Sequence, residues 1–527
     1  MLNVRTTPFK QQTLIGLGVS VLGLLLAWEM GGWIAEGNLD QVVLLGLAIT
    51  ISALGLSILR NWRAGFYLFL VWLVFEDLIR KYLGNNMAIF FAKDALAGLI
   101  YISLYRATRE RRNNWFRPPF LLALGFFFWF AVLQIFNPYS PSVLYGALAL
   151  KVYFFYVPLV FVGYALVRTD QDLRRLLIVV LLLVAVVSGL GIIQAIVGPG
   201  FLSPTTLAPD IRELGALQKV TPITHQVFNL PASVFVSSWR YGQFLILAIV
   251  VALGAAGYFL LESGRGKWIV FTSLGIVAVG VLLCGSRGTL ILSVVSSAVM
   301  SLAFLWGSPW RTRQVHRILR AIRRSILVMG ICLALAALSF PKEVGRRLDF
   351  YSETLSPSSS SYELSHRIWD YPIDQLMLAF SEPHWIVGNG TGTASLGMQY
   401  VARLLNQRPP QVGVESGYGG ILVEMGILGL TLWMIWTAVL VISCWRVVRK
   451  LRQTRLFPIG FAVFWFALVL SFPQMYSSLN SYPDYAANAF LWLLVGILFR
   501  LPELILKRPG GSSLPAVNSA LNELPSH

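Results

Sequence analysis

Long apolar runs separated by short polar segments are the feature that most constrains this chain. The runs are about 17–24 residues long, the length a helix needs to cross roughly 30 Å of hydrocarbon. Only 13% of the 527 residues are charged, too few to cover a water-facing surface. Strands of a transmembrane barrel would instead alternate over about ten residues. The sequence therefore predicts an all-α, polytopic transmembrane helical bundle.

The runs predict about 14 spans, within a range of about 11–14, and the two that flank Gly285 are the hardest to delimit. They cover residues 13–35, 41–59, 64–82, 88–105, 118–136, 146–167, 176–197, 241–261, 268–285, 288–306, 325–340, 417–442, 456–475 and 485–500. We expect four regions: membrane helices over 1–340, a large extracytoplasmic loop with short helices over 341–416, further membrane helices over 417–505, and a disordered cytoplasmic tail over 506–527.

Basic loops predict the orientation. The segments Arg106–Arg117, Arg311–Arg324 and Arg446–Arg455 are rich in basic residues and fall on the side of the N-terminus. By the positive-inside tendency this side is the cytoplasm, so both termini are inside. The loops 198–240 and 341–416 are then outside. Orientation and anionic membrane lipids account for the net charge of +18, so we expect no nucleic-acid partner.

Charges inside or at the edges of spans are costly and require a partner or a function. The predicted topology brings several such charges to the outer leaflet: Glu76, Asp77, Arg80, Lys81, Lys93, Asp94 and Lys151. In the span 64–82, two acids precede two basic residues by four positions, the spacing of helical ion pairs. The cluster is either a set of paired structural charges or the lining of a site. Lys151 alternatively extends to the lipid headgroups.

Two arginines stand at the outer starts of predicted spans. Arg287, in Gly285-Ser-Arg-Gly288, combines a fixed positive charge with the N–H donors of a helix start, an arrangement that favours phosphate. The alternative is an arginine that anchors a tight turn to lipid phosphate. Arg240 has a similar position and the same two interpretations.

Within the large loop, residues 365–379 have the pattern of a helix with a kink near Pro372. One face would carry Arg367, with His366 four residues before Asp370. Another face, with Leu364, Ile368, Leu376 and Phe380, would lie on the bundle. His366 is a candidate proton acceptor or simply a surface histidine in an ion pair. The turn Gly388-Asn-Gly-Thr-Gly392 allows a close backbone approach, to a ligand among other things.

Several short motifs resemble the bacterial O-antigen ligase and O-antigen polymerase superfamily. They are Gly285-Ser-Arg-Gly288, His366-Arg-Ile-Trp369 followed by Val387-Gly-Asn-Gly390, the re-entry Tyr418–Leu430 with Glu424-Met-Gly-Ile-Leu-Gly-Leu430, Phe75-Glu-Asp-Leu-Ile-Arg-Lys-Tyr82 and Lys93-Asp94. The match covers most of the chain loosely, through the order, spacing and sidedness of the motifs.

The resemblance implies a multi-pass glycosyltransferase of the bacterial inner membrane that acts in surface-polysaccharide biosynthesis. Its donor is a glycan on a polyprenyl diphosphate, and its acceptor is a hydroxyl of a glycan or lipid-linked glycan. By analogy, Arg287, Arg240 and Arg367 would bind the diphosphate and stabilise the leaving group. The resemblance implies no metal and no cofactor. Partners would be membrane lipids and other polysaccharide-assembly proteins.

One position departs from the family pattern. Ligases have a His-Asn-like pair before the final re-entry, and this chain has Glu415-Ser416. A glutamate can also act as general base, so Glu415 and His366 are the candidate catalytic residues. The departure favours a polymerase over a ligase that joins polymer to lipid A core. Glu415 alternatively pairs with a nearby arginine. A transporter of lipid-linked sugar or a small solute, and a scaffold of an export complex, are the rival functions.

Overall fold

The computed structural model describes residues 52–110, 116–207, 211–262, 266–309, 337–395, 397–408, 413–478 and 481–506, with 410 and single positions from 323 to 334. The predicted span 13–35, residues 41–51 of the span 41–59, half of the span 325–340, and the tail after 506 lie outside these residues.

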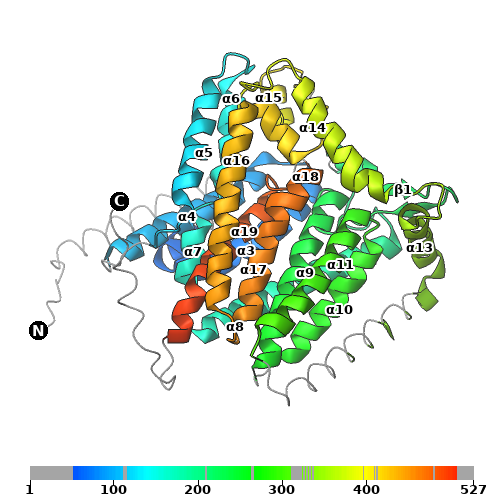
Figure 1. The fold of residues 1–527 in the computed structure, drawn as a ribbon, viewed down its shortest axis with the longest axis horizontal. Coiled ribbons are helices and arrows are strands. Elements are labelled where there is room, and N and C mark those ends of the chain that lie inside the picture. Colours follow the sequence, from blue (N-terminus) through cyan, green and yellow to red (C-terminus); the bar gives the residue numbers. More distant parts are fainter. Residues whose placement is uncertain are drawn as a thin grey trace, which may run out of the picture.

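The described chain is almost entirely helical (Figure 1). Before the large loop come α3 (Trp62–Tyr82), α4 (Met87–Glu110), α5 (Leu121–Leu133), η1 (Gln134–Phe136), α6 (Val143–Phe154), α7 (Leu159–Leu166), α8 (Asp170–Val197), η2 (Arg212–Ala216), α9 (Ser238–Leu261), α10 (Lys267–Leu283) and α11 (Arg287–Gly307). A short antiparallel hairpin, β1 (Gln218–Val220) and β2 (Val227–Asn229), lies between α8 and α9. The loop holds α13 (Pro341–Leu355), η3 (His366–Asp370), α14 (Tyr371–Ser381) and α15 (Met398–Leu404). Then follow α16 (Gly417–Lys450), α17 (Phe457–Val469), η4 (Leu470–Gln474), α18 (Met475–Ser477) and α19 (Tyr485–Leu506).

Eight helices of the described part are long and apolar enough to cross a membrane. They are Met87–Arg109, Val143–Leu166, Asp170–Val197, Ser238–Leu261, Arg287–Gly307, Gly417–Lys450, Phe457–Ser477 and Tyr485–Leu506. Every predicted span within the described residues coincides with a helix, including the shorter α5 and α10 and the more charged α3. The chain is therefore an all-α polytopic membrane protein, and the total of about 14 spans stays a prediction.

The centre of the bundle is built from α9, α17 and α19, most of whose side chains are buried. Beside them, large aromatic side chains fill the space between α16 and α19. Trp433 and Trp436 meet edge to face with ring centroids 5.0 Å apart, and Trp436 stacks on Trp492 at 6.0 Å. Such contacts add directional packing to the dispersion forces that hold helices together in lipid.

The helices α7 and α19 approach closely because each has a glycine at the crossing. A Cβ atom on Gly163 would lie 2.2 Å from the carbonyl oxygen of Leu493, and one on Gly496 would lie 2.0 Å from that of Val160. No side chain fits at such distances. The pair follows the rule that small residues let membrane helices pack backbone to backbone.

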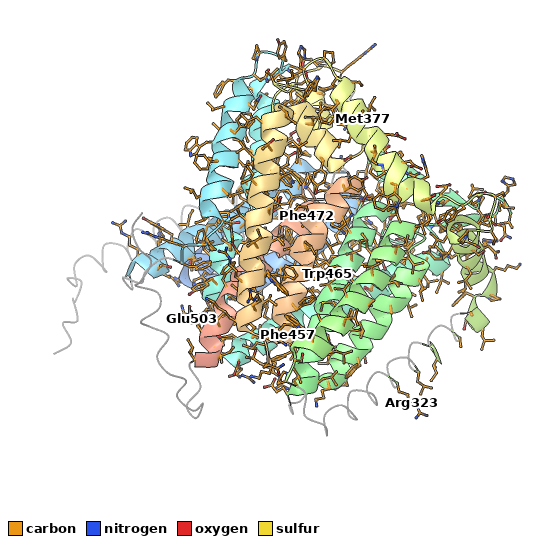
Figure 2. The ribbon with its side chains drawn as sticks, in the orientation of Figure 1. Arg323, Met377, Phe457, Trp465, Phe472 and Glu503 are labelled. Atoms are coloured by element: carbon orange, nitrogen blue, oxygen red, sulfur yellow. The ribbon has the colours of Figure 1, made fainter. Side chains whose placement is uncertain are left out.

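The two ends of the bundle differ in character. The loop end is the end at which β1, α13, α14 and α15 gather (Figure 1). In Figure 2, Met377 on α14 marks this end, and Glu503 on α19 marks the opposite end. At the opposite end Arg455 pairs with Glu262, at 3.2 Å, just after the last turn of α9. The starts of α9, α11 and α16 all lie toward the loop end.

We expect Gly163→Ala to lower the apparent unfolding temperature of the detergent-purified protein, because the added methyl group forces α7 and α19 apart. The expected cost is about 1–3 kcal/mol of overpacking. Gly98→Ala on α4 is the matched control, since a Cβ atom there meets no heavy atom within 4 Å. Equal unfolding temperatures for both variants would contradict the close helix crossing.

Candidate functional site

Arg287 is held at the loop end by a turn that only glycine fits. Gly285 has a φ of +68°, and a Cβ atom there would lie 2.7 Å from the Leu230 side chain. Ser286 then caps α11 by accepting a hydrogen bond from the backbone N–H of Thr289. Arg287 is thus the first residue of α11, as predicted. Its side chain is 16% exposed and lies 2.9 Å from the Glu363 carboxylate.

Glu363 brings a second arginine to the same place. The Arg367 guanidinium lies 3.6 Å from the carboxylate oxygen that Arg287 contacts. Lys219, on β1, adds a third positive charge beside them: its amine lies 4.3 Å from the Phe350 ring, and the Arg287 guanidinium lies 5.3 Å from that ring. We call Lys219, Arg287, Glu363 and Arg367 the loop cation cluster. Its formal charge is +2, the sum of three cations and one carboxylate.

The predicted proton acceptors adjoin this cluster through Tyr371. The Tyr371 hydroxyl donates a hydrogen bond to the Glu415 carboxylate, and burial followed by that carboxylate raises the pKa of Tyr371. The same ring lies 4.6 Å from the Arg367 guanidinium and 6.1 Å from the His366 ring. Glu415, His366, Arg367 and Arg287 therefore belong to one connected group at the loop end.

The local backbone explains why the predicted helix differs from the observed one. A helix is present over the predicted segment, but it starts with the π-turn η3. The wider turn shifts the faces, since each π-turn holds about one residue more than an α-turn. Leu376 and Phe380 still pack toward α16, whereas Ile368 is 41% exposed. The prediction that Ile368 shares their buried face is wrong for this reason.

Most of the remaining predicted charges form, together with Asp484, a separate, buried charge network between α3, α4, α6, α9 and the start of α19. Its members are Glu76, Asp77, Arg80, Lys93, Asp94, Lys151, Arg240 and Asp484. Asp77 lies 2.9 Å from both Arg80 and Arg240, and Arg240 also lies 3.4 Å from Asp484. The family resemblance grouped Arg240 with Arg287 and Arg367. In the structure Arg240 instead belongs to the buried charge network, although α9 and α11 are neighbours.

The other members of the network are also paired. Lys93 lies 3.2 Å from Glu76, and Lys151 lies 2.6 Å from Asp94. Lys81, which was predicted to join them, is instead fully buried against the loop 198–240. Its amine donates to the carbonyl groups of Ser233 and Phe235, each at 2.9 Å, and to the Ser203 hydroxyl. Lys81 thereby attaches this loop to α3.

The glycine turn 388–392 contacts protein backbone. Its N–H groups at Asn389 and Gly390 donate to the carbonyl groups of Val423 and Glu424, at 2.8 and 2.9 Å. The receiving helix, α16, is broken there because Gly426 has a φ of +68°. A Cβ atom on Gly388 would lie 2.5 Å from the Glu424 carbonyl oxygen. The close approach expected of this turn is made to α16.

Glu424 secures the same junction and has no exposed surface. Its carboxylate accepts from the N–H of Ala394 at 3.0 Å and from the hydroxyl of Tyr153 at 3.2 Å. A buried, fully bonded carboxylate of this kind ties three segments together. The sequence shows that Glu424 lies inside a glycine-rich re-entry. It does not show which groups bond to Glu424, because these partners are distant along the chain.

Sequence reasoning missed three residues of the site: Lys219, Glu363 and Tyr371. Glu363 stands four residues before Arg367, so helical spacing could have found that pair. Lys219 lies in a loop between spans, where a lysine has no distinguishing pattern. Its position depends on packing between the hairpin and α13, which Phe228 and Phe350 make with ring centroids 5.3 Å apart.

No protein-family model matches this chain, and no curated protein matches it. Among the described residues, no group of three or more histidine, cysteine, aspartate or glutamate side chains could hold a metal ion. The arrangement offers three cations that can bind an anion, beside a carboxylate and an imidazole that can accept a proton.

We expect Arg240→Gln to destabilise the protein strongly, because it leaves the buried Asp484 carboxylate without its cation and removes one of two from Asp77. Breaking a buried ion pair costs about 3–5 kcal/mol. Arg346→Gln, which removes a partly exposed pair with Glu343 on α13, should cost less than about 1 kcal/mol. Thermal unfolding in detergent measures both. Equal stability of the two variants would contradict a structural role for Arg240.

Proposed function

We propose that this protein is a membrane glycosyltransferase that uses a glycan carried on a polyprenyl diphosphate. The observation that supports this best is the loop cation cluster, in which Arg287 and Arg367 share one carboxylate beside two candidate proton acceptors. A net positive charge at the end of a membrane bundle is suited to a lipid-linked anion. The resemblance to O-antigen polymerases and ligases points to the same donor.

In the proposed reaction an acceptor hydroxyl attacks the anomeric carbon of the donor glycan. The new bond forms to the acceptor oxygen as the bond from that carbon to the diphosphate oxygen breaks, with inversion at the carbon. Negative charge then develops on the departing diphosphate. Arg287 and Arg367 stabilise this charge, and the proton of the acceptor passes to a base on the protein. By the family resemblance, both Arg240 and Arg367 are possible second arginines beside Arg287. The proposed reaction uses Arg367.

The base is Glu415 or His366, and the two have different surroundings. Glu415 is oriented by the Tyr371 hydroxyl and by its own N–H, which donates to Gln375 at 2.7 Å. His366 has Asp370 at 3.5 Å, a carboxylate able to orient the imidazole. Both side chains are exposed, so an acceptor glycan can reach either one.

The full proposal places the protein in the bacterial inner membrane, with about 14 spans, both termini in the cytoplasm and the loop end outside. The position of Glu415 where ligases have a histidine favours the polymerase, which joins repeat units, over the ligase, which transfers polymer to lipid A core. Cells lacking the protein distinguish these: a polymerase mutant accumulates single repeat units on the lipid carrier, and a ligase mutant accumulates unattached polymer.

We expect Arg287→Ala to reduce glycan transfer from a lipid-linked donor about 100- to 1000-fold, the usual effect of removing one group that stabilises a developing anion. Arg287→Lys should retain part of the activity, since it keeps the charge without the forked geometry. Transfer is measured in membranes at equal protein level, with Arg346→Ala on α13 as the matched control. Undiminished transfer by Arg287→Ala would remove this arginine from the mechanism.

A further inference from the structure

Lys219 stands on a hairpin that is fixed in place on the bundle. At one end of the hairpin, Arg347 of α13 is 1% exposed and donates to the carbonyl groups of Asn229, Leu283 and Ala195, at 2.7, 2.9 and 3.0 Å. These carbonyl groups belong to β2, α10 and α8, respectively. The position of Lys219 beside Arg287 is therefore part of the folded structure.

The turn of the hairpin is fixed as well. Glu353, also on α13, accepts hydrogen bonds from the N–H groups of Ile223 and Thr224, at 2.7 and 3.2 Å, and from the Thr224 hydroxyl at 2.8 Å. These bonds outweigh burial and lower the pKa of Glu353, so the carboxylate stays ionised and bonded at neutral pH. Both ends of β1 and β2 are thus attached to α13, the helix that also carries Phe350.

Four titratable groups from separate segments of the chain face Lys219. Arg287 of α11 and Arg367 of η3 repel it, Glu363 attracts it, and Cys284 at the end of α10 is also near. In the described part of the chain, Glu363 pairs with the two arginines, and no ion pair includes Lys219. The cluster thus holds three cations and one carboxylate, so its formal charge is +2.

Glu363 and Arg367 are accessible as well as charged. Their side chains are 37% and 50% exposed, so an anion from solvent or from the lipid surface can reach them. Glu363 is the group that a phosphate would have to replace, because its carboxylate already lies between the two guanidinium groups. Each phosphate of a diphosphate esterified at both ends has two terminal acceptor oxygens, as a carboxylate has, so it matches the fork of an arginine equally well.

We propose that Lys219 is a third phosphate-binding residue of this site, and that Glu363 is an internal counter-ion whose place a phosphate takes. This inference rests on the proposed function and extends it: the diphosphate of the donor would contact Lys219 and Arg287 with one phosphate and Arg367 with the other. Binding would then separate Glu363 from Arg287, and the loop segment that carries η3 would adjust around the ligand.

The proposal has a pH dependence whose sign follows from Lys219. Burial, then repulsion by Arg287 and Arg367, lowers the pKa of Lys219 to about 8. A bound dianion favours the protonated amine and raises that pKa, so binding takes up a proton where the free amine is neutral. Affinity should be highest below about pH 8 and should fall above it. An arginine at position 219 stays charged and should remove this fall.

The test is direct binding to the purified full-length protein in nanodiscs. The probe is a short-chain prenyl diphosphate that carries one sugar, because both of its phosphates are esterified and its charge stays constant from about pH 7 to pH 9. We expect Lys219→Gln to weaken binding about 10-fold and Glu363→Gln to strengthen it several-fold. Lys219→Arg should keep the affinity and lose the pH dependence. Lys342→Gln, an exposed lysine of α13, is the charge-matched control and should change nothing.

The outcomes separate this inference from the proposed function. Wild-type affinity in Lys219→Gln, or weaker binding in Glu363→Gln, overturns the inference. If Arg287→Ala still weakens binding in that case, the diphosphate site itself stands without Lys219. If Arg287→Ala and Lys219→Gln both bind like the wild type, the proposed diphosphate site is wrong as well. Thermal unfolding of each variant confirms that it is folded, and Lys219→Arg keeps the test valid if Lys219→Gln is unstable.

Discussion

The arrangement of the loop end depends on hydrogen bonds between the turn 388–392 and the break in α16. Inside a bilayer, unpaired backbone groups are too costly to leave exposed, so a broken helix is tolerated where another segment satisfies it. Here the turn bonds to Val423 and Glu424, and the N–H of Ile427 beyond the break donates to Ile386 at 3.2 Å. The turn follows α14, which begins at Tyr371, and α16 follows Glu415. The junction between the turn and α16 therefore helps to hold Tyr371 and Glu415 near the loop cation cluster.

The contrast between the two groups of charges decides which one is suited to bind a ligand. In the buried charge network four carboxylates and four cations are closely paired, with Asp77 and Glu76 fully buried. Separating such a pair leaves an uncompensated charge in a poorly solvated place, so these residues act on stability. The loop cation cluster has an excess of positive charge and an accessible carboxylate. Exchange of that carboxylate for the proposed diphosphate would keep Arg287 and Arg367 paired and would give Lys219 a partner, so ligand binding there would cost little.

Much of the fold follows from the sequence because bilayer thickness sets the length of an apolar run. That constraint predicted the helices within the described residues, and the motif Gly285-Ser-Arg-Gly288 predicted the helix start at Arg287. The position of a residue along its helix was predictable in this way, whereas the direction in which its side chain faces around the helix was not. Arg240 and Arg287 start neighbouring helices, yet one side chain turns to α3 and α19 and the other to the loop. The rotation of each helix depends on packing between distant segments. Lys219 shows the same limit, because its site exists only once the hairpin has packed on α13.

We propose above all that a lipid-linked diphosphate binds in the loop cation cluster. A cryo-EM structure of the protein in nanodiscs with a sugar-bearing prenyl diphosphate tests this most directly. We predict density for the diphosphate between Arg287, Arg367 and Lys219, with the Glu363 carboxylate displaced from Arg287 and the sugar directed toward Tyr371. Diphosphate density at another position, with Glu363 still paired to both arginines, would contradict the account.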